Sequence, residues 1–171
     1  TRLLVQGVVE YFEELFCEDA PRNGTYYDTQ CEENGWTSQG LAIGPFLFPE
    51  HPRAAVWEAG YRRWAANTAV LSADRRRDRS RYTVTTLHPD FTTENHAFVH
   101  PDYLNAALCL RGPIAILSMG TGRPVAEEIL VHDEEIYDRV LKPWILADGG
   151  SLYPQGQEDR KSTRLNSSHR I

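Results

Sequence analysis

Apolar residues that recur at spacings of three and four constrain the fold of this chain more than any other feature of its sequence. The stretch Leu4–Phe16 is the first example, and its apolar residues share one predicted helical face. They are Leu4, Val5, Val8, Val9, Phe12, Leu15 and Phe16. Similar patterns predict a helix over Gln30–Phe46 and another from His51 to about Ser72. We therefore expect an all-α fold.

The second half of the chain returns to helical patterns after a long polar connection. Ala73–Val99 is rich in Thr and long for a segment without regular structure, and only Tyr82–Leu87 within it has a strand-like pattern. The next helical pattern is expected to kink or break at Gly112–Pro113. Two further helical pieces are predicted over Val125–Val131 and Glu134–Ile145.

Alternating short and long loops between these segments favour antiparallel helical hairpins. One weak repeat agrees with this interpretation, because Glu33-Asn34 recurs as Glu94-Asn95 ahead of a later apolar segment. The two dipeptides are 61 residues apart, which is a plausible length for one hairpin, although so short a match also arises by chance. Stacked hairpins are therefore our structural hypothesis.

The end of the chain is expected to differ from the rest in origin. Asp159–His169 reads DRKSTRLNSSH, which resembles one translated frame of an adapter used in short-read DNA sequencing. Foreign segments are excluded from fold reasoning, and we expect residues 159–171 to pack against nothing. The chain also begins without Met. We expect residues 1–158 to be an internal piece of a larger protein, comprising part of one catalytic module.

Charge and composition exclude some classes of partner. The formal net charge is −6, and without residues 159–171 there are 14 Lys and Arg against 23 Asp and Glu, a net charge of −9. An acidic body argues against nonspecific binding to nucleic acid. No apolar run approaches a membrane span, so no membrane partner is expected. The three cysteines, Cys17, Cys31 and Cys109, lack metal-like spacing and are interpreted as helix-packing thiols without disulfides.

The densest polar cluster is Leu87–Tyr103, which reads LHPDFTTENHAFVHPDY. Polar groups crowded onto an irregular loop beside helices are typical of active sites. Capping of the following helix is the alternative, and it accounts for Asp102. It does not account for Asn95 and His96 beside a second imidazole, that of His100.

A metal site is not expected in this cluster. His96 and His100 are four residues apart and would share a face only on a continuous helix, which Pro101 argues against. Ala97 also stands where the glutamate of an HExxH motif would be. We expect neither a metal nor another cofactor.

Three segments in order along the chain carry a resemblance to a known family. ENHAFVHPDY, with the earlier EENGWTSQGLAIGPFLFPEHP and the later DGGSLYPQGQ, resembles the catalytic modules of heparinase II/III-like and alginate-lyase-like polysaccharide lyases. The resemblance covers most of residues 1–158 and implies about half of an incomplete (α/α) toroid of helical hairpins. It also implies an acidic polysaccharide or oligosaccharide as the partner, and a periplasmic or secreted bacterial enzyme.

The resemblance assigns roles to particular residues. These lyases carry an Asn-His pair, often followed by Gly, on the inner wall of the cleft. Asn95-His96 match the pair, and Ala97 replaces the Gly. A catalytic Tyr lies in a later segment with Asp-Gly and Gln, where this chain has Tyr153; the alternative is a Tyr beyond the end of the match. Residues expected to bind substrate surround the pair or lie near the start of the earlier predicted helix. They are Glu94, His100, Tyr103, Trp36 and Asn34.

The implied reaction is β-elimination at a uronate. The C5 proton becomes removable when a hydrogen-bond donor neutralises the adjacent carboxylate, because the developing enediolate charge is then stabilised. Asn95 would supply that donor, and His96 would donate or act as a base near neutral pH. The Tyr153 phenol would remove the C5 proton or protonate the leaving oxygen. As an internal piece, the chain by itself is expected to be inactive.

Two other functions remain open from the sequence. A glycoside hydrolase on a related (α/α) barrel would need two carboxylates flanking the scissile bond, and Glu33 and Glu94 are the candidates. A noncatalytic helical scaffold or binding protein is the other. That function would be favoured if Asn95, His96 and Tyr153 lay in separate environments.

Overall fold

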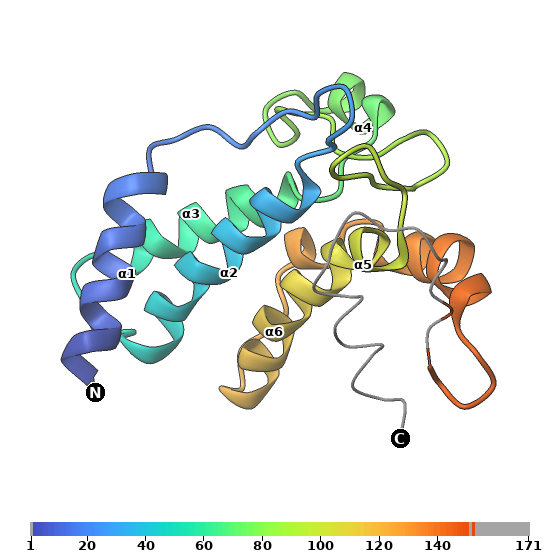
Figure 1. Cartoon of the computed structure of the whole chain (residues 1–171). Coiled ribbons are helices and arrows are strands. Elements are labelled where there is room, and N and C mark those ends of the chain that lie inside the picture. The colour runs from blue at the N-terminus through green and yellow to red at the C-terminus, as the bar shows by residue number, and fades with distance from the viewer. Residues whose placement is uncertain (1, 151, 153–171) are drawn as a thin grey trace.

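Helices form every regular element of the computed structural model, which describes residues 2–150 and residue 152 (Figure 1). The α-helices are α1 (Arg2–Phe16), α2 (Cys31–Leu47), α3 (Ala54–Ala66), α4 (Ser72–Arg77), α5 (Pro101–Leu104), α6 (Ala106–Gly120) and α7 (Asp133–Glu135). Shorter turns of other helix types are η1 (Glu127–Ile129), the π-helical η2 (Ile136–Leu141) and η3 (Lys142–Trp144). No strand occurs among the described residues, so the all-α prediction is confirmed there. Tyr153 and residues 159–171 lie outside the described residues.

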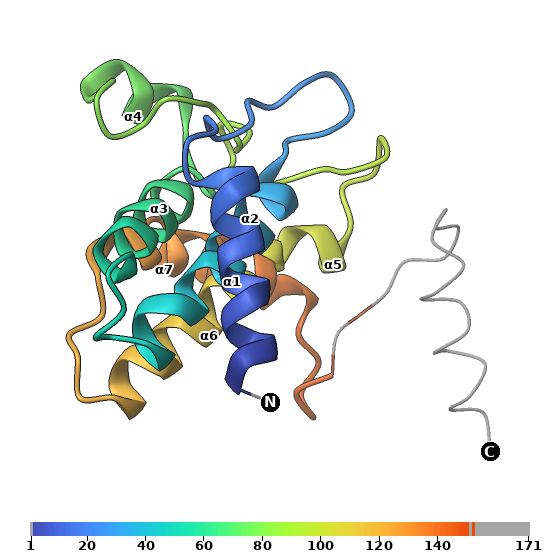
Figure 2. The ribbon, with the colours of Figure 1, turned by 90° about the vertical axis from the view of Figure 1, so that its left-hand side faces the viewer.

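The helices α2 and α3 form an antiparallel hairpin, with α1 packed on it (Figures 1 and 2). Gly44 makes the close approach possible. A Cβ atom there would lie 2.5 Å from the Trp57 ring and 2.7 Å from Val9 Cγ1, so no larger residue fits without displacement. Trp57 and Val9 are fully buried.

A second antiparallel pair begins with α6, which packs against α2. The chain then turns back along α6, because η1 contacts α6 and α3 whereas η2 contacts α5. Arg111 of α6 and Ile114 one turn later are both fully buried, and Ile129 of η1 is buried near Ile114. The structure thus shows one helical hairpin, α2 with α3, and a short segment after α6 that returns over α3 and α6.

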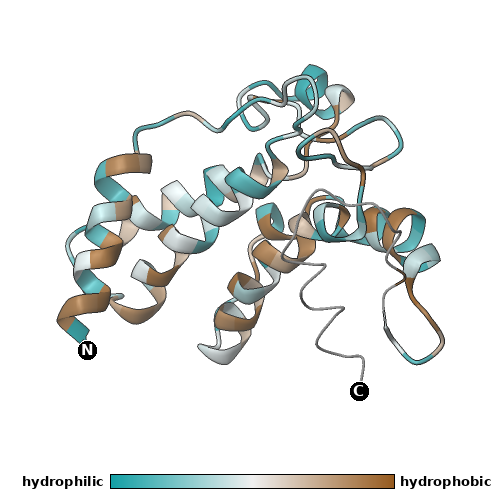
Figure 3. Cartoon of the chain, in the orientation of Figure 1, coloured by the Kyte–Doolittle hydropathy of each residue, from teal (hydrophilic) through white to brown (hydrophobic). Residues whose placement is uncertain are grey.

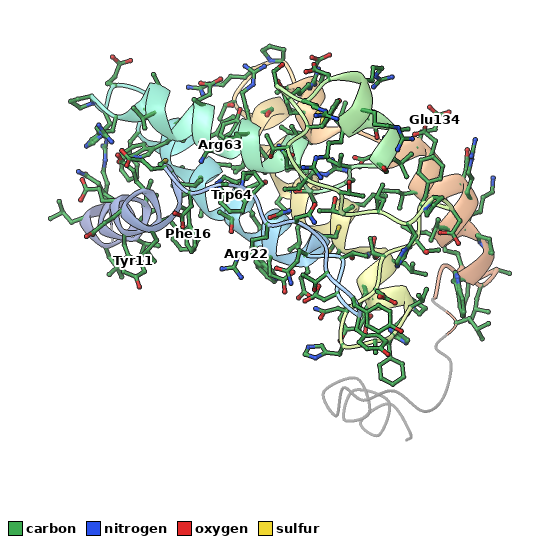
Figure 4. The ribbon with its side chains drawn as sticks, turned by 90° about the horizontal axis from the view of Figure 1, so that it is seen from above. Tyr11, Phe16, Arg22, Arg63, Trp64 and Glu134 are labelled. Atoms are coloured by element: carbon green, nitrogen blue, oxygen red, sulfur yellow. The ribbon has the colours of Figure 1, made fainter. Side chains whose placement is uncertain are left out.

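Side chains of α3 satisfy the C-terminal end of α1. Figure 4 shows Phe16 beside Trp64, whose indole N–H donates to the Phe16 carbonyl at 3.0 Å. The Arg63 guanidinium donates to the carbonyls of Phe16, Cys17 and Asp19 at 3.2, 2.7 and 2.6 Å. The last carbonyls of a helix lack intrahelical partners, so these bonds fix where α1 ends.

The single apolar face predicted for α1 is only half buried. Val9 is fully buried and Phe12 and Phe16 pack on the core, whereas Leu4 is 73 % and Leu15 is 40 % exposed. Figure 3 shows apolar residues along α1, and Figure 4 shows Tyr11 pointing away from the other helices. The apolar stripe is wider than the surface that α2 and α3 cover.

Two predicted boundaries are wrong for identifiable reasons. The third helix ends at Ala66 rather than Ser72, because the buried Asn67 binds the Arg81 carbonyl and the Thr83 N–H through its side chain. The predicted break at Gly112–Pro113 is absent, and α6 is continuous. Pro113 has no N–H to donate to the Cys109 carbonyl. Cys109 is exposed, so the helix tolerates the loss of this bond.

The strand-like pattern at Tyr82–Leu87 is also wrong. Tyr82, Val84 and Leu87 are buried, which produces the alternation. The N–H groups of Thr86 and Leu87 donate to the Val70 carbonyl at 2.9 and 3.0 Å, so they form no ladder. The segment is irregular backbone laid on the core. The later prediction over Val125–Val131 shrinks to η1, and the one over Glu134–Ile145 divides into α7, η2 and η3.

The cysteines are free thiols, as expected. Cys31 is buried and packs in the core, but Cys109 is exposed, so its assignment as a packing thiol is wrong. Within the described part of the chain, no helix has the length and apolar character needed to cross a membrane.

Candidate functional site

Two tight turns, Thr25–Asp28 and Asn95–Phe98, lie next to each other where the long connections meet. Paired backbone hydrogen bonds close each turn, at 2.7 and 3.3 Å in the first and at 2.9 and 3.1 Å in the second. The Ala97 N–H donates to the Tyr27 carbonyl at 2.9 Å and joins the two turns. The predicted Asn-His pair therefore sits on a turn that a distant segment holds in place.

The second turn has left-handed backbone at both central positions. His96 has φ 52° and Ala97 has φ 65°. This geometry is that of a type I′ turn, in which glycine is favoured because other residues are strained at positive φ. Glycine would therefore be favoured at position 97, where this chain has Ala97.

Replacing Ala97 with glycine is expected to stabilise the protein by about 1 kcal/mol, because it relieves left-handed strain at a non-glycine residue. Ala59 is the matched control, since it is exposed in the middle of α3. Ala59→Gly should instead cost about 1 kcal/mol of helix propensity. Urea unfolding of both variants measures the difference. A destabilised Ala97→Gly variant would contradict the assigned turn.

Asn95 points inward from its turn and binds a carboxylate. It is 9 % exposed, and its side-chain amide donates to Glu32 Oε2 at 3.0 Å. The other carboxylate oxygen accepts from the Trp36 indole N–H at 3.3 Å. Glu32 lies in the first turn of α2, where an acid is favoured by the helix dipole. Glu32 therefore connects two predicted site residues.

Sequence analysis did not identify Glu32 as a site residue. Its position four residues before Trp36 on a helix places the two side chains on one face, and this spacing was the available signal. The contact with Asn95 joins residues 63 positions apart, and no local pattern reports it.

A small closed pocket lies at this junction, with no room for a water molecule. Its lining residues are Asp28, Thr29, Cys31, Glu32, Thr93, Glu94, Asn95, Tyr103 and Ala106. They include three carboxylates and neither Lys nor Arg, so the pocket has a negative potential. Burial raises the pKa of the Cys31 thiol to about 12, and this thiol is therefore no nucleophile near neutral pH.

Three predicted residues lie around the Asn95 amide, and a fourth, His96, lies outside it. Glu94 and Tyr103 line the pocket, and Trp36 is 56 % exposed at its edge. His96 is exposed, with its ring centroid 6.4 Å from that of Tyr103. Asn95 and His96 thus share one turn, but the amide faces inward and the imidazole faces solvent.

His100 has a structural role that differs from the predicted one. It is 3 % exposed, and its Nδ1 accepts from the Asp102 N–H at 3.2 Å, which caps α5. Burial lowers the pKa of His100, an effect that favours the neutral, accepting imidazole. Assigning His100 to substrate was therefore wrong. A cap in this region was predicted, but from other side chains.

Asn34 is a core residue and does not line the pocket at the two turns. It is fully buried, and its amide donates to the carbonyls of Arg22 and Asn67 at 2.9 and 3.0 Å while accepting from the Arg22 N–H. Figure 4 labels Arg22, which lies in the connection between α1 and α2. The substrate-binding prediction for Asn34 was wrong, because this amide is fully used in joining three backbone segments.

The repeat of Glu33-Asn34 and Glu94-Asn95 has no structural counterpart. The first pair lies inside α2, whereas the second leads into a tight turn. Burial raises the pKa of Glu33, and this residue does not line the pocket that Glu94 lines. The dipeptide match was therefore accidental.

No group of three or more His, Cys, Asp or Glu side chains in the described ranges is arranged to hold a metal ion. Known protein families, curated proteins and solved structures contain no match to this chain. The geometry of the site is therefore the ground on which a function is assigned.

Proposed function

We propose that this chain carries part of the active site of a polysaccharide lyase that cleaves a uronate-containing glycan by β-elimination. The two antiparallel pairs, α2 with α3 and α6 with its returning segment, would be hairpins of an incomplete (α/α) toroid. One observation carries the proposal: the Asn95 amide, fixed in its turn, donates to a carboxylate at the pocket.

The substrate carboxylate would replace that of Glu32 at the Asn95 amide. Hydrogen bonding there stabilises the charge that develops as the C5 proton leaves. His96 is exposed beside the turn and is placed to take or donate a proton. The C4–O bond then breaks, a C4–C5 double bond forms, and the leaving oxygen takes a proton. Tyr153 would remove the C5 proton or protonate the leaving oxygen. Among the described residues, Tyr103 places a phenol near His96.

The acidic lining sets a condition on this chemistry. Asp28, Glu32 and Glu94 disfavour a further carboxylate in the pocket. The closed pocket accommodates a uronate only if the Glu32 side chain moves away. Glu32 therefore controls access to the Asn95 amide, and its charge is the simplest quantity to change.

A glycoside hydrolase is the second candidate, and one observation favours it. Glu32 and Glu94 line the same pocket and together offer the two carboxylates that hydrolysis requires. The pair differs from the one expected from the sequence, since Glu33 lies away from the pocket. Here Glu32 would be indispensable, whereas in a lyase it only competes with substrate.

Glu32→Gln distinguishes the two functions in the full-length gene product that contains this chain. For the lyase, kcat/KM on uronate polymers should rise about fivefold or more, because removing a carboxylate relieves repulsion of at least about 1 kcal/mol. The product is an unsaturated sugar, measured by its ultraviolet absorbance. Glu50→Gln, in an exposed turn, controls for net charge. Two results together would assign hydrolysis instead. The unmodified protein would form reducing ends without ultraviolet absorbance, and the Glu32→Gln variant would lose turnover.

A further inference from the structure

A separate groove of about 310 Å³ lies at the other end of α2, away from the two turns. Its lining residues are Phe46, Glu58, Tyr61, Arg62, Arg123, Pro124 and Ala126. They come from the end of α2, from α3 and from the segment between α6 and η1. The volume falls in the range of small-molecule sites, about 300–1,000 Å³.

One guanidinium in the groove has no carboxylate partner. Arg62 is held by Glu128 through three contacts of 3.1–3.2 Å and lies 4.0 Å from Glu58. Arg123 instead lies over the Phe46 ring, 5.0 Å from its centroid. Among the described residues it forms no ion pair. Two arginines thus face two carboxylates, Glu58 and Glu128, and Arg123 is the arginine left available to an added anion.

The wall beside this cation is aromatic and carries a hydroxyl group. The Phe46 and Tyr61 ring centroids are 6.0 Å apart, and the two residues are 7 % and 3 % exposed. Burial, and then Glu58, raise the pKa of Tyr61, so its phenol stays protonated and able to donate near neutral pH. The small exposed edges of two aromatic rings thus adjoin a guanidinium and a phenol.

We propose that this groove binds a small carboxylate carried on a six-membered ring. The carboxylate would pair with Arg123, which is suited to planar anions, and the ligand ring would lie against the exposed edges of Phe46 and Tyr61. A sugar acid and an aromatic acid share this chemistry. The site lies apart from the Asn95 pocket and does not depend on the function proposed above.

Calorimetric titration of the chain with glucuronate and with benzoate tests the site, with glucose and benzyl alcohol as uncharged counterparts. At least one acid should bind, and Arg123→Gln should weaken it about tenfold or more, the loss of one charge-assisted contact. Arg79→Gln, at an exposed arginine without an ion pair among the described residues, should leave binding unchanged. Tyr61→Phe keeps the ring and should weaken binding severalfold through loss of the hydroxyl.

The two acids separate the possible ligands. Tighter binding of glucuronate assigns a sugar acid, and tighter binding of benzoate assigns an aromatic acid. Equal binding of acids and uncharged counterparts would overturn the proposal, as would no binding of either acid, or binding that Arg123→Gln leaves intact. Circular dichroism of each variant shows that the fold is retained. Glu32→Gln should not affect this binding, which keeps the result independent of the lyase proposal.

Discussion

Asn95→Ala is expected to lower kcat of the full-length gene product about 10²–10³-fold, the effect of removing one preorganised donor from a developing oxyanion. The fall should appear in the rate of unsaturated-product formation. The variant should also lose about 1 kcal/mol of stability, because the partly buried Glu32 loses one hydrogen bond. Glu94 remains in place, because its backbone carbonyl accepts from the Thr29 N–H at 2.9 Å.

The structural alternative predicts a different pair of results. If Asn95 serves only to join its turn to α2, the melting temperature falls while kcat stays near normal. Asn95→Asp is the sharper control, because it keeps the side-chain shape but places two carboxylates in contact with each other. Near-normal turnover of Asn95→Ala would remove the Asn-His pair from the mechanism.

The largest stability loss is expected from Asp133→Ala. Asp133 forms an ion pair with Arg111, which is fully buried and also donates to the Val131 carbonyl at 2.8 Å. Removing the carboxylate leaves a buried cation without a counter-charge, at a cost of about 3–5 kcal/mol. Urea unfolding measures it. Glu134→Ala, at the exposed neighbouring residue labelled in Figure 4, should change stability by less than about 0.5 kcal/mol.

Removing both charges should cost far less than removing one. Burial lowers the pKa of Arg111 and raises that of Asp133, so for each group desolvation outweighs the attraction of its partner. The double variant Arg111→Met, Asp133→Leu is therefore expected to lie within about 1–2 kcal/mol of the unmodified protein. A double variant as unstable as Asp133→Ala would show that the pair itself stabilises the fold.

Periodicity predicted the long helices well, because their apolar residues are buried by neighbouring helices. The limits of α2 differ from the prediction by a single residue at each end. Features that depend on distant partners were not predictable. The end of α3 is fixed by the contacts of Asn67 with a later segment, and the uninterrupted α6 depends on Pro113 facing a turn where a lost bond is tolerated.

The site was partly predictable for the same reason. Local polarity identified Glu94, Asn95 and His96 on one loop, and the structure places Trp36 near them through Glu32. Asn34 was misassigned because the sequence shows a side-chain amide but does not show the backbone carbonyls to which that amide donates. Burial decides the role of such polar residues, and it becomes visible only when the segments are assembled.

Fluorescence of Trp36 during titration of this chain with a uronate tetrasaccharide tests the central claim most directly. A uronate carboxylate that displaces Glu32 from the Asn95 amide also releases the Trp36 indole, so the emission should change, and Trp36→Phe should abolish the change. Glu32→Gln should tighten binding about fivefold or more, since carboxylates about 4 Å apart repel by at least about 1 kcal/mol. A neutral tetrasaccharide that binds equally well, or uronate binding that Glu32→Gln leaves unchanged, would contradict the account.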